Sequence, residues 1–248
     1  MGSSRSDDGR VFCCIHCGIE TPELYHSYSP TVLKISECAQ CKLPADGYIE
    51  CDLTLVLLDL FLQKLPAYRH VLCNSALKNA WRLLLIFVLC DAYYNWVESK
   101  AAIDGRTTVD IYDLEWHFYV NILQASIEAL VTVSVIAPFC LCLWQWRGTA
   151  PRAIVGAASP TIRSYLRAVV NKLQVGFYGN VLVLLAVVWE QHHSTSFMIL
   201  TRIFLFVTHV QVLRAITNVG FARAAPIIIL AMGTGRLARV VSVRALRE

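Results

Sequence analysis

The chain has 248 residues, of which 56% are hydrophobic and 16% are charged, and its mean hydropathy is +0.51. Soluble domains carry about 25% charged residues, so the composition excludes an ordinary soluble protein and indicates one embedded in a membrane. The formal net charge of +4 is small, and no stripe of arginine and lysine alternates with aromatic residues, so we expect no nucleic acid as a partner.

Residues 1–11 form a polar first segment. They lack the apolar core and the small-residue cleavage site of a secretory signal peptide. We expect this segment to be disordered, and we expect the chain to enter the membrane through internal apolar segments.

Two Cys-x-x-Cys pairs follow, and twenty residues separate them. The first pair is Cys14 with Cys17, and the second is Cys38 with Cys41. This spacing is typical of a four-thiolate zinc site, in which each tight turn supplies two sulfur ligands to one tetrahedral ion. Cys13 is an alternative ligand, although a C-x3-C loop is less favourable. Since four sulfurs leave no open position for a substrate, we expect Zn²⁺ to be structural here.

The segment that holds these pairs, residues 12–52, has the pattern of a small β-rich zinc ribbon. Residues 24–36 are rich in aromatic and β-branched side chains around a Ser-Pro turn, and residues 48–50 have a similar character, so short strands are expected in both places. The segment has little apolar mass, so the metal should supply much of its folding free energy. Thiolate ligands also require a reducing compartment, which favours the cytosol.

Residues 53–80 are predicted to form an interfacial helix and a connector. The apolar run of residues 53–65 has too few residues to span a bilayer, and its leucines leave only a narrow polar stripe. Pro66 is expected to end this helix. The alternative is a helix buried in a small soluble domain, but an apolar span follows it closely.

Residues 81–248 are predicted to form the transmembrane region. Four apolar segments in it are expected to cross the bilayer, at residues 81–97, 119–146, 173–189 and 196–213. A fifth run, residues 224–232, has about half of the ~20 residues that a span requires, so we expect an interfacial or re-entrant helix there. The predicted fold class is an α-helical integral membrane protein with a small β-rich zinc ribbon and about four transmembrane helices.

The charges of the loops predict the orientation of these helices. Residues 98–118 contain five acidic and two basic residues, whereas residues 147–172 contain five basic residues and no acidic one. Because basic loops face the cytosol, four spans place both termini of the chain in the cytosol.

Three ionisable residues, Asp91, Glu128 and Arg202, lie inside the predicted spans. Such a group costs ~2.5–3.5 kcal/mol at the centre of a span, so it usually faces the helix bundle and finds a partner. Glu128 and Arg202 have similar depths, and we expect them to pair, either as a salt bridge that locks the bundle or as part of a lipid headgroup site. Asp91 is nearer to the end of its helix and is expected to reach water.

Several motifs in the chain resemble those of one protein family. They are Cys14-Ile-His-Cys17, Glu23-Leu24-Tyr25, Val32-Leu33-Lys34-Ile35, Cys38-Ala-Gln-Cys41, Asp46-Gly47-Tyr48-Ile49-Glu50, Tyr68-Arg69-His70-Val71-Leu72-Cys73-Asn74 and Asp91-Ala92-Tyr93. Together they look like the Arv homology domain, with dense similarity over residues 12–96. The resemblance implies a multi-pass protein of the endoplasmic reticulum membrane, or of the Golgi. It also implies a role in sterol export, in sphingolipid balance and in delivery of glycosylphosphatidylinositol intermediates.

Catalytic motifs are absent from the sequence. There is no G-x-S-x-G elbow and no G-x-x-x-x-G-K-[ST] loop, and seven histidines are too few for a membrane di-iron site. We therefore expect a protein that is not an enzyme and whose partners are membrane lipids, including sterols. The alternative is a non-catalytic membrane adaptor whose zinc ribbon recruits lipid-biosynthesis enzymes of the endoplasmic reticulum.

Overall fold

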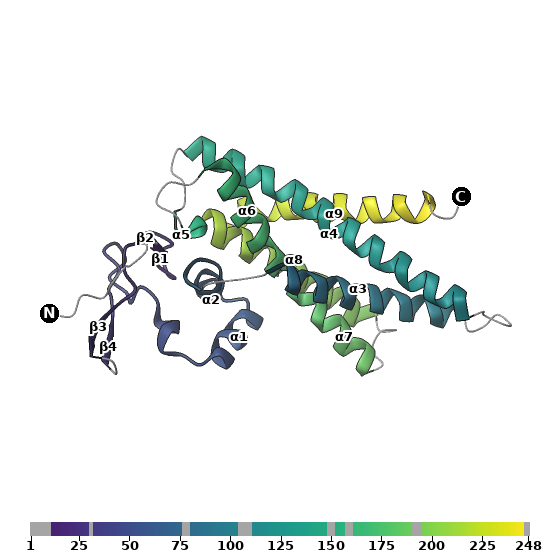
Figure 1. Ribbon diagram of the computed structural model, residues 1–248, viewed down its shortest axis with the longest axis horizontal. Helices are drawn as coiled ribbons and strands as arrows, with labels where there is room; N and C mark the ends of the chain where they lie inside the picture. The colour runs from purple at the N-terminus through teal and green to yellow at the C-terminus, as the bar shows by residue number, and fades with distance from the viewer. Residues whose placement is uncertain are drawn as a thin grey trace. The chain divides into compact units, whose positions relative to one another are not determined.

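The computed structural model describes residues 11–29, 32–75, 80–103, 111–147, 152–156, 161–189 and 195–245. The disorder expected of residues 1–11 concerns a segment that, apart from its last residue, lies outside the described residues. Parts of the loops whose charges predict the orientation also lie outside them. The described part of the chain is mostly helical and divides into two compact units (Figure 1).

The first unit contains residues 1–78, 137–172 and 211–224. Its N-terminal part holds two antiparallel hairpins, in which β1 (Phe12–Cys13) pairs with β2 (Glu20–Thr21), and β3 (Tyr25–Ser29) pairs with β4 (Val32–Ile35). The second hairpin lies where the sequence predicted strands, at residues 24–36.

The strand predicted at residues 48–50 is wrong, because a short 3-10 helix, η1 (Gly47–Glu50), occupies this place. Asp46 precedes η1 in an extended conformation, and its side chain accepts a hydrogen bond from the backbone N–H of Tyr48 at 3.0 Å. Such an N-cap favours the start of a helix over the continuation of a strand.

Three short helical elements follow the ribbon. They are α1 (Leu53–Phe61), α2 (Leu65–Arg69) and η2 (His70–Asn74), of which the last is a π-helix. The sequence predicted one helix over residues 53–65, ended by Pro66. Instead α1 ends at Phe61, after which Gln63 adopts a left-handed φ of 59°. Pro66 begins a helix instead of ending one, because it lies in the first turn of α2, where its missing N–H loses no bond.

The remaining segments of the first unit come from longer elements. They belong to the end of α4 (Ile111–Arg147), to α5 (Arg152–Val155) and most of α6 (Ile162–Leu173), and to the connection between α8 (Thr195–Thr217) and α9 (Phe221–Ala245). The helix α5 lies against β1 and η2. Arg147 of α4 donates a hydrogen bond to the carbonyl of Thr217 at 2.7 Å. The end of α4, the helix α5 and the α8–α9 connection are therefore part of the same unit as the ribbon.

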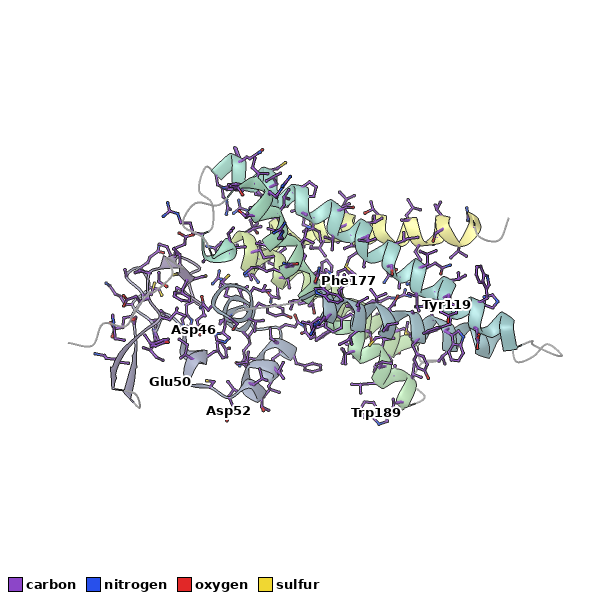
Figure 2. All side chains as sticks on the ribbon, in the orientation of Figure 1. Asp46, Glu50, Asp52, Tyr119, Phe177 and Trp189 are labelled. Carbon is purple, nitrogen blue, oxygen red and sulfur yellow. The ribbon has the colours of Figure 1, made fainter. Side chains whose placement is uncertain are left out.

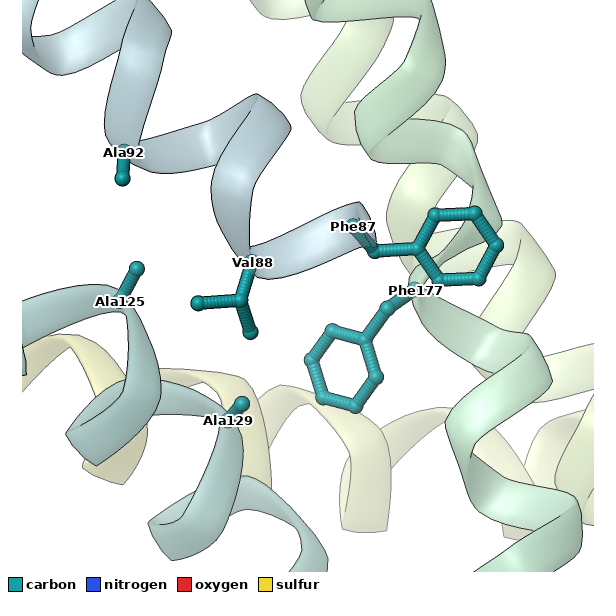
Figure 3. Close-up of a cluster of buried hydrophobic side chains, with 6 residues drawn as sticks. All are labelled: Phe87, Val88, Ala92, Ala125, Ala129 and Phe177. Carbon is teal, nitrogen blue, oxygen red and sulfur yellow. The ribbon is translucent and has the colours of Figure 1, made fainter. Parts of the chain in front are cut away.

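The second unit contains residues 79–136, 173–210 and 225–248. It holds α3 (Ala80–Ile103), η3 (Gln174–Gly179), α7 (Asn180–Val188), the first part of α4 and most of α8 and α9. Its apolar core consists of Phe87, Val88, Ala92, Ala125, Ala129 and Phe177 (Figure 3). The small alanines allow α3 and α4 to approach closely, as is common between membrane helices.

Four helical segments among the described residues are long and apolar enough to cross a membrane: Glu115–Arg147, Ile162–Val188, Ser196–Thr217 and Phe221–Arg244. The fold class predicted from the sequence is thus confirmed. The first three segments overlap predicted spans, but the fourth is α9. The predicted span at residues 81–97 lies within α3, which has 24 residues and is not among these four segments.

The short helix predicted at residues 224–232 is wrong, because α9 has 25 residues. The apolar run ends at Met232, yet the helix continues through glycines and arginines. Gly235 lies against α4, where a Cβ atom would come within 2.5 Å of the Thr132 hydroxyl and 3.0 Å of the Glu128 carbonyl. The polar residues that end the apolar run face a neighbouring helix, so the helix does not need to end with it.

Candidate functional site

The structure brings together the four cysteines of the two sequence pairs. The sulfur atoms of Cys14, Cys17, Cys38 and Cys41 all lie within 4.8 Å of one another. The Cys14–Cys41 and Cys17–Cys38 sulfur distances are 3.7 and 3.6 Å. A tetrahedral ion with metal–sulfur bonds of ~2.3 Å separates its sulfurs by about 3.8 Å. The arrangement therefore fits one metal ion.

The pKa values of three of these thiols are shifted in opposite directions by the knuckle backbone and by burial. Backbone N–H groups of Cys41 and Gln40 donate to the Cys38 sulfur and lower its pKa to about 6, against the opposing effect of burial. Burial raises the pKa of Cys17 to about 12 and also raises that of Cys14. Because thiolates repel one another, a positive ion is needed for all four to be ionised together.

Cys13, the alternative ligand, is not part of this cluster. Its thiol donates to the Cys14 carbonyl at 3.4 Å and bonds to the Cys73 thiol, an interaction that raises the pKa of Cys13. The four thiols that lie close enough to share one ion are those of the two Cys-x-x-Cys pairs, so the geometry favours them over Cys13 as ligands.

A buried polar network holds the first knuckle against η2. Asp46, which is labelled in Figure 2, is fully buried. Its carboxylate accepts hydrogen bonds from His70 Nδ1 and Asn74 Nδ2, each at 2.7 Å. Asn74 also bonds to both the N–H and the carbonyl of Cys13 at 2.9 Å. These bonds join two segments that are 61 residues apart in the chain.

Arg69 binds the backbone of the knuckle itself. One guanidinium nitrogen donates to the carbonyls of Ile15 at 3.0 Å and His16 at 2.5 Å, and the other donates to the side-chain oxygen of Asn218 at 2.6 Å. The Asn218 amide in turn donates to the Cys17 carbonyl at 3.3 Å. The ribbon is thus fixed to α2 and to the α8–α9 connection.

Sequence reasoning treated residues 53–80 as a connector and missed this role. The signal was present in the Tyr68–Asn74 motif, where Arg69, His70 and Asn74 interrupt an apolar stretch. Buried polar side chains of this kind require bonded partners, and for Arg69 the backbone carbonyls of the metal knuckle are such partners.

A cavity of about 280 Å³, whose lining is mainly apolar but includes several charged side chains, lies in the second unit, between α3, α4, α8, α9 and the η3–α7 segment. All three intramembrane residues singled out from the sequence, Asp91, Glu128 and Arg202, line this cavity. Arg236, Arg239 and His209 line it as well, and the sequence analysis did not include them. The two arginines were missed because the short helix predicted at residues 224–232 ends before them.

The ion pairs of the cavity differ from the predicted one. Arg239 Nη1 lies 2.8 Å from Asp91 Oδ2 and 2.9 Å from Glu128 Oε2, and Arg236 Nε lies 3.9 Å from Glu128 Oε1. Within the described part of the chain, Arg202 forms no ion pair. Glu128 therefore pairs with arginines of α9 instead of with Arg202, and Asp91, which was expected to reach water, is also bonded there.

The comparisons with known proteins cover most of the chain. The model of the Arv1-like family matches residues 13–213. Protein ARV1 of Mus musculus is 32% identical over 88% of this chain and 78% of its own length, and Protein ARV1 of Homo sapiens is 31% identical over 83% and 72%. Protein ARV 1 of Arabidopsis thaliana is 26% identical over 88% and 83%. No solved structure matches the chain.

Proposed function

The chain belongs to the Arv1-like family, and from this premise we propose that it mediates sterol and lipid homeostasis without being an enzyme. Membership in the family supports a general role in sterol and lipid homeostasis. The finer proposal is that the protein affects sterol export, sphingolipid balance and the delivery of glycosylphosphatidylinositol intermediates. The observation that carries it is a cavity with charged side chains in its lining, which lies among helices of membrane length and where a lipid headgroup can be held.

The metal in the ribbon is proposed to be Zn²⁺ with a structural role. Four thiolates in a tetrahedron favour zinc or iron among biological metals, and the two Cys-x-x-Cys turns have the spacing of zinc ribbons. In this proposal Cys14, Cys17, Cys38 and Cys41 hold the ion, which fixes the carbonyls that Arg69 binds. The zinc thereby connects ribbon folding to the α2–η2 segment.

The proposed location is the endoplasmic reticulum membrane, with the ribbon in the cytosol. Reduced thiols support a cytosolic ribbon. Arg147 and Arg152, basic residues of the α4–α5 connection, belong to the same unit as the ribbon, and the positive-inside rule places such residues in the cytosol. Leu53, Leu57 and Leu58 of α1 are more than half exposed, which supports contact of α1 with the bilayer interface.

The adaptor function is the second candidate. Apolar side chains are exposed on the ribbon, with Ile19 at 42%, Tyr25 at 41% and Leu43 at 46%. Such residues suit the core of a protein interface, and they favour recruitment of a lipid-biosynthesis enzyme by the ribbon.

Photo-crosslinking in membranes tests the two functions against each other. The full chain is expressed in cells that lack their own copy, labelled with a photoactivatable sterol and, in parallel, a photoactivatable glycolipid, and the adducts are mapped by mass spectrometry. Saturable lipid adducts on the helices of the second unit are expected. Adducts to other proteins alone, through the ribbon, would favour the adaptor.

A further inference from the structure

The charged side chains that line the cavity of the second unit carry an excess of positive charge. Three guanidinium groups, those of Arg202, Arg236 and Arg239, line it together with two carboxylates, those of Asp91 and Glu128, so the difference is +1. Arginine stays protonated in proteins. A charge between membrane helices is costly unless an opposite charge is close to it.

The excess is located at Arg202 and Arg236. Arg239 is held between the two carboxylates, whereas Arg236 reaches Glu128 only at 3.9 Å. Arg202 forms no ion pair with any described residue, and its positive charge repels that of Arg236. Two guanidinium groups that repel each other within one cavity form a suitable site for an anion.

Two buried polar atoms at the cavity also lack a partner among the described residues. One is Nη2 of Arg239, which is a hydrogen-bond donor. The other is Nε2 of His209, a residue that is only 3% exposed. His209 Nδ1 lies 2.8 Å from the Leu205 carbonyl. Since a carbonyl only accepts, Nδ1 carries the proton and Nε2 of the neutral ring is an acceptor. The cavity therefore offers both a free donor and a free acceptor.

The histidine ring is fixed in this orientation. The ring of Phe177 meets it edge-on, with centroids 4.8 Å apart and planes at 87°. The ring also lies close to Gly176, where a Cβ atom would come within 2.8 Å of it. A ring that is held so closely cannot turn Nε2 toward another partner, and an unbonded buried acceptor costs free energy until a ligand donates to it.

We propose that this cavity binds the headgroup of an anionic phospholipid that carries a free hydroxyl. The phosphate lies between Arg202 and Arg236 and accepts from Arg239 Nη2, and the hydroxyl donates to His209 Nε2. The inference rests on the proposed function and names one lipid class for it. A sterol hydroxyl is neutral and would leave the charge excess uncompensated.

The size and surroundings of the cavity favour a lipid over free phosphate. Its volume of about 280 Å³ is near the lower limit of small-molecule pockets, so it accommodates a headgroup and leaves the acyl chains outside. Leu200 and Ile203, which flank Arg202 on α8, are more than half exposed, as is Leu237 beside Arg236 on α9. These apolar surfaces can contact acyl chains next to the headgroup.

Native mass spectrometry of the purified full chain tests the proposal. The protein is exposed in detergent to phosphatidylglycerol, phosphatidylcholine and diacylglycerol with identical acyl chains. Phosphatidylglycerol should be retained about tenfold more than diacylglycerol, as expected for one charge-assisted interaction. Equal retention of the two by the wild-type protein overturns the proposal without any variant. Displacement of phosphatidylglycerol by a large excess of inorganic phosphate overturns its assignment to a lipid.

The variant Arg202→Gln should lose this preference, whereas Arg163→Gln, which changes an exposed arginine of α6 outside the cavity, should keep it. Undiminished retention by a folded Arg202→Gln protein contradicts the proposal. The photoactivatable sterol separates the inference from the proposed function. If the wild-type protein retains phosphatidylglycerol but forms no sterol adducts, the sterol function alone is contradicted. If it forms sterol adducts but does not prefer phosphatidylglycerol to diacylglycerol, the inference alone is contradicted.

Discussion

The hydrogen-bonded network around Asp46 and the charged groups of the cavity are bonded to different extents. In the first unit, both carboxylate oxygens of Asp46 accept hydrogen bonds, and Asn74 uses both its oxygen and its nitrogen. In the second unit, Asp91 and Glu128 share Arg239, while His209 Nε2 and Arg239 Nη2 have no hydrogen-bond partner among the residues that the structure describes. A network whose groups are bonded to one another specifies one structure, whereas a network with free atoms is suited to a ligand. Substitutions in the two regions should therefore have different consequences.

Loss of a metal ligand should have the largest effect. A structural zinc site contributes on the order of 10 kcal/mol to folding, so Cys38→Ser should unfold the ribbon and release the metal. Elemental analysis of the purified protein should find one zinc per wild-type chain and none in the variant. Cys51→Ser is the control, since Cys51 is exposed and outside the cluster. Full zinc content in the Cys38→Ser protein would refute the ligand assignment.

Breaking the hydrogen-bonded network should have the next largest effect. Asn74→Ala leaves the Cys13 backbone and Asp46 each short of a partner, which should cost about 2–4 kcal/mol. The measurement is the rate at which a maleimide labels Cys13, which is buried in the wild-type protein. Labelling should accelerate in this variant but not in Ser134→Ala, which changes an exposed residue bonded only within α4. An unchanged rate would mean that the network does not hold the knuckle.

Charge changes in the cavity should act in opposite directions. Glu128→Gln leaves Arg239 with one carboxylate and should destabilise the protein by about 2–3 kcal/mol, less than for a fully buried pair because Glu128 is 22% exposed. Arg202→Gln removes a repelling charge and should raise the melting temperature in lipid-free detergent. Lower melting temperatures for both variants would show that Arg202 has an unseen stabilising partner.

The smallest effect is expected where the histidine is held. Gly176→Ala forces the His209 ring to shift and should cost about 1–2 kcal/mol, as overpacking does. It should also reduce phosphatidylglycerol retention, because Nε2 moves with the ring. Gly220→Ala is the control, since nothing lies within 4 Å of its Cβ position. Wild-type stability and retention in Gly176→Ala would indicate that the ring has more freedom than its contacts suggest.

The metal cluster and the β3–β4 hairpin could be predicted because their determinants are local. The ligand spacing and the turn between the strands are both visible within a few dozen residues. The contacts of Arg69 and those inside the cavity could not be predicted in this way. Arg69 meets Asn218 across 149 positions of the chain, and Arg239 meets Asp91 across 148. On a hydropathy scale, Arg236 and Arg239 interrupt an apolar run. In the folded chain their carboxylate partners, Asp91 and Glu128, make both arginines compatible with a helix of membrane length.

The length of α9 has a consequence for the sidedness of the C-terminus. A helix of 25 residues is about 37 Å long, which exceeds the ~30 Å hydrocarbon thickness of a bilayer. If α3 crosses the bilayer together with the four candidate segments, the chain has five spans, and a cytosolic ribbon then places the C-terminus in the lumen, whereas four spans predict a cytosolic C-terminus. With five spans, an N-glycosylation acceptor appended after residue 248 should be modified, and one inserted near residue 155 should not. The chain would in that case carry its final arginines in the lumen, where a modifying enzyme or a partner protein could reach them.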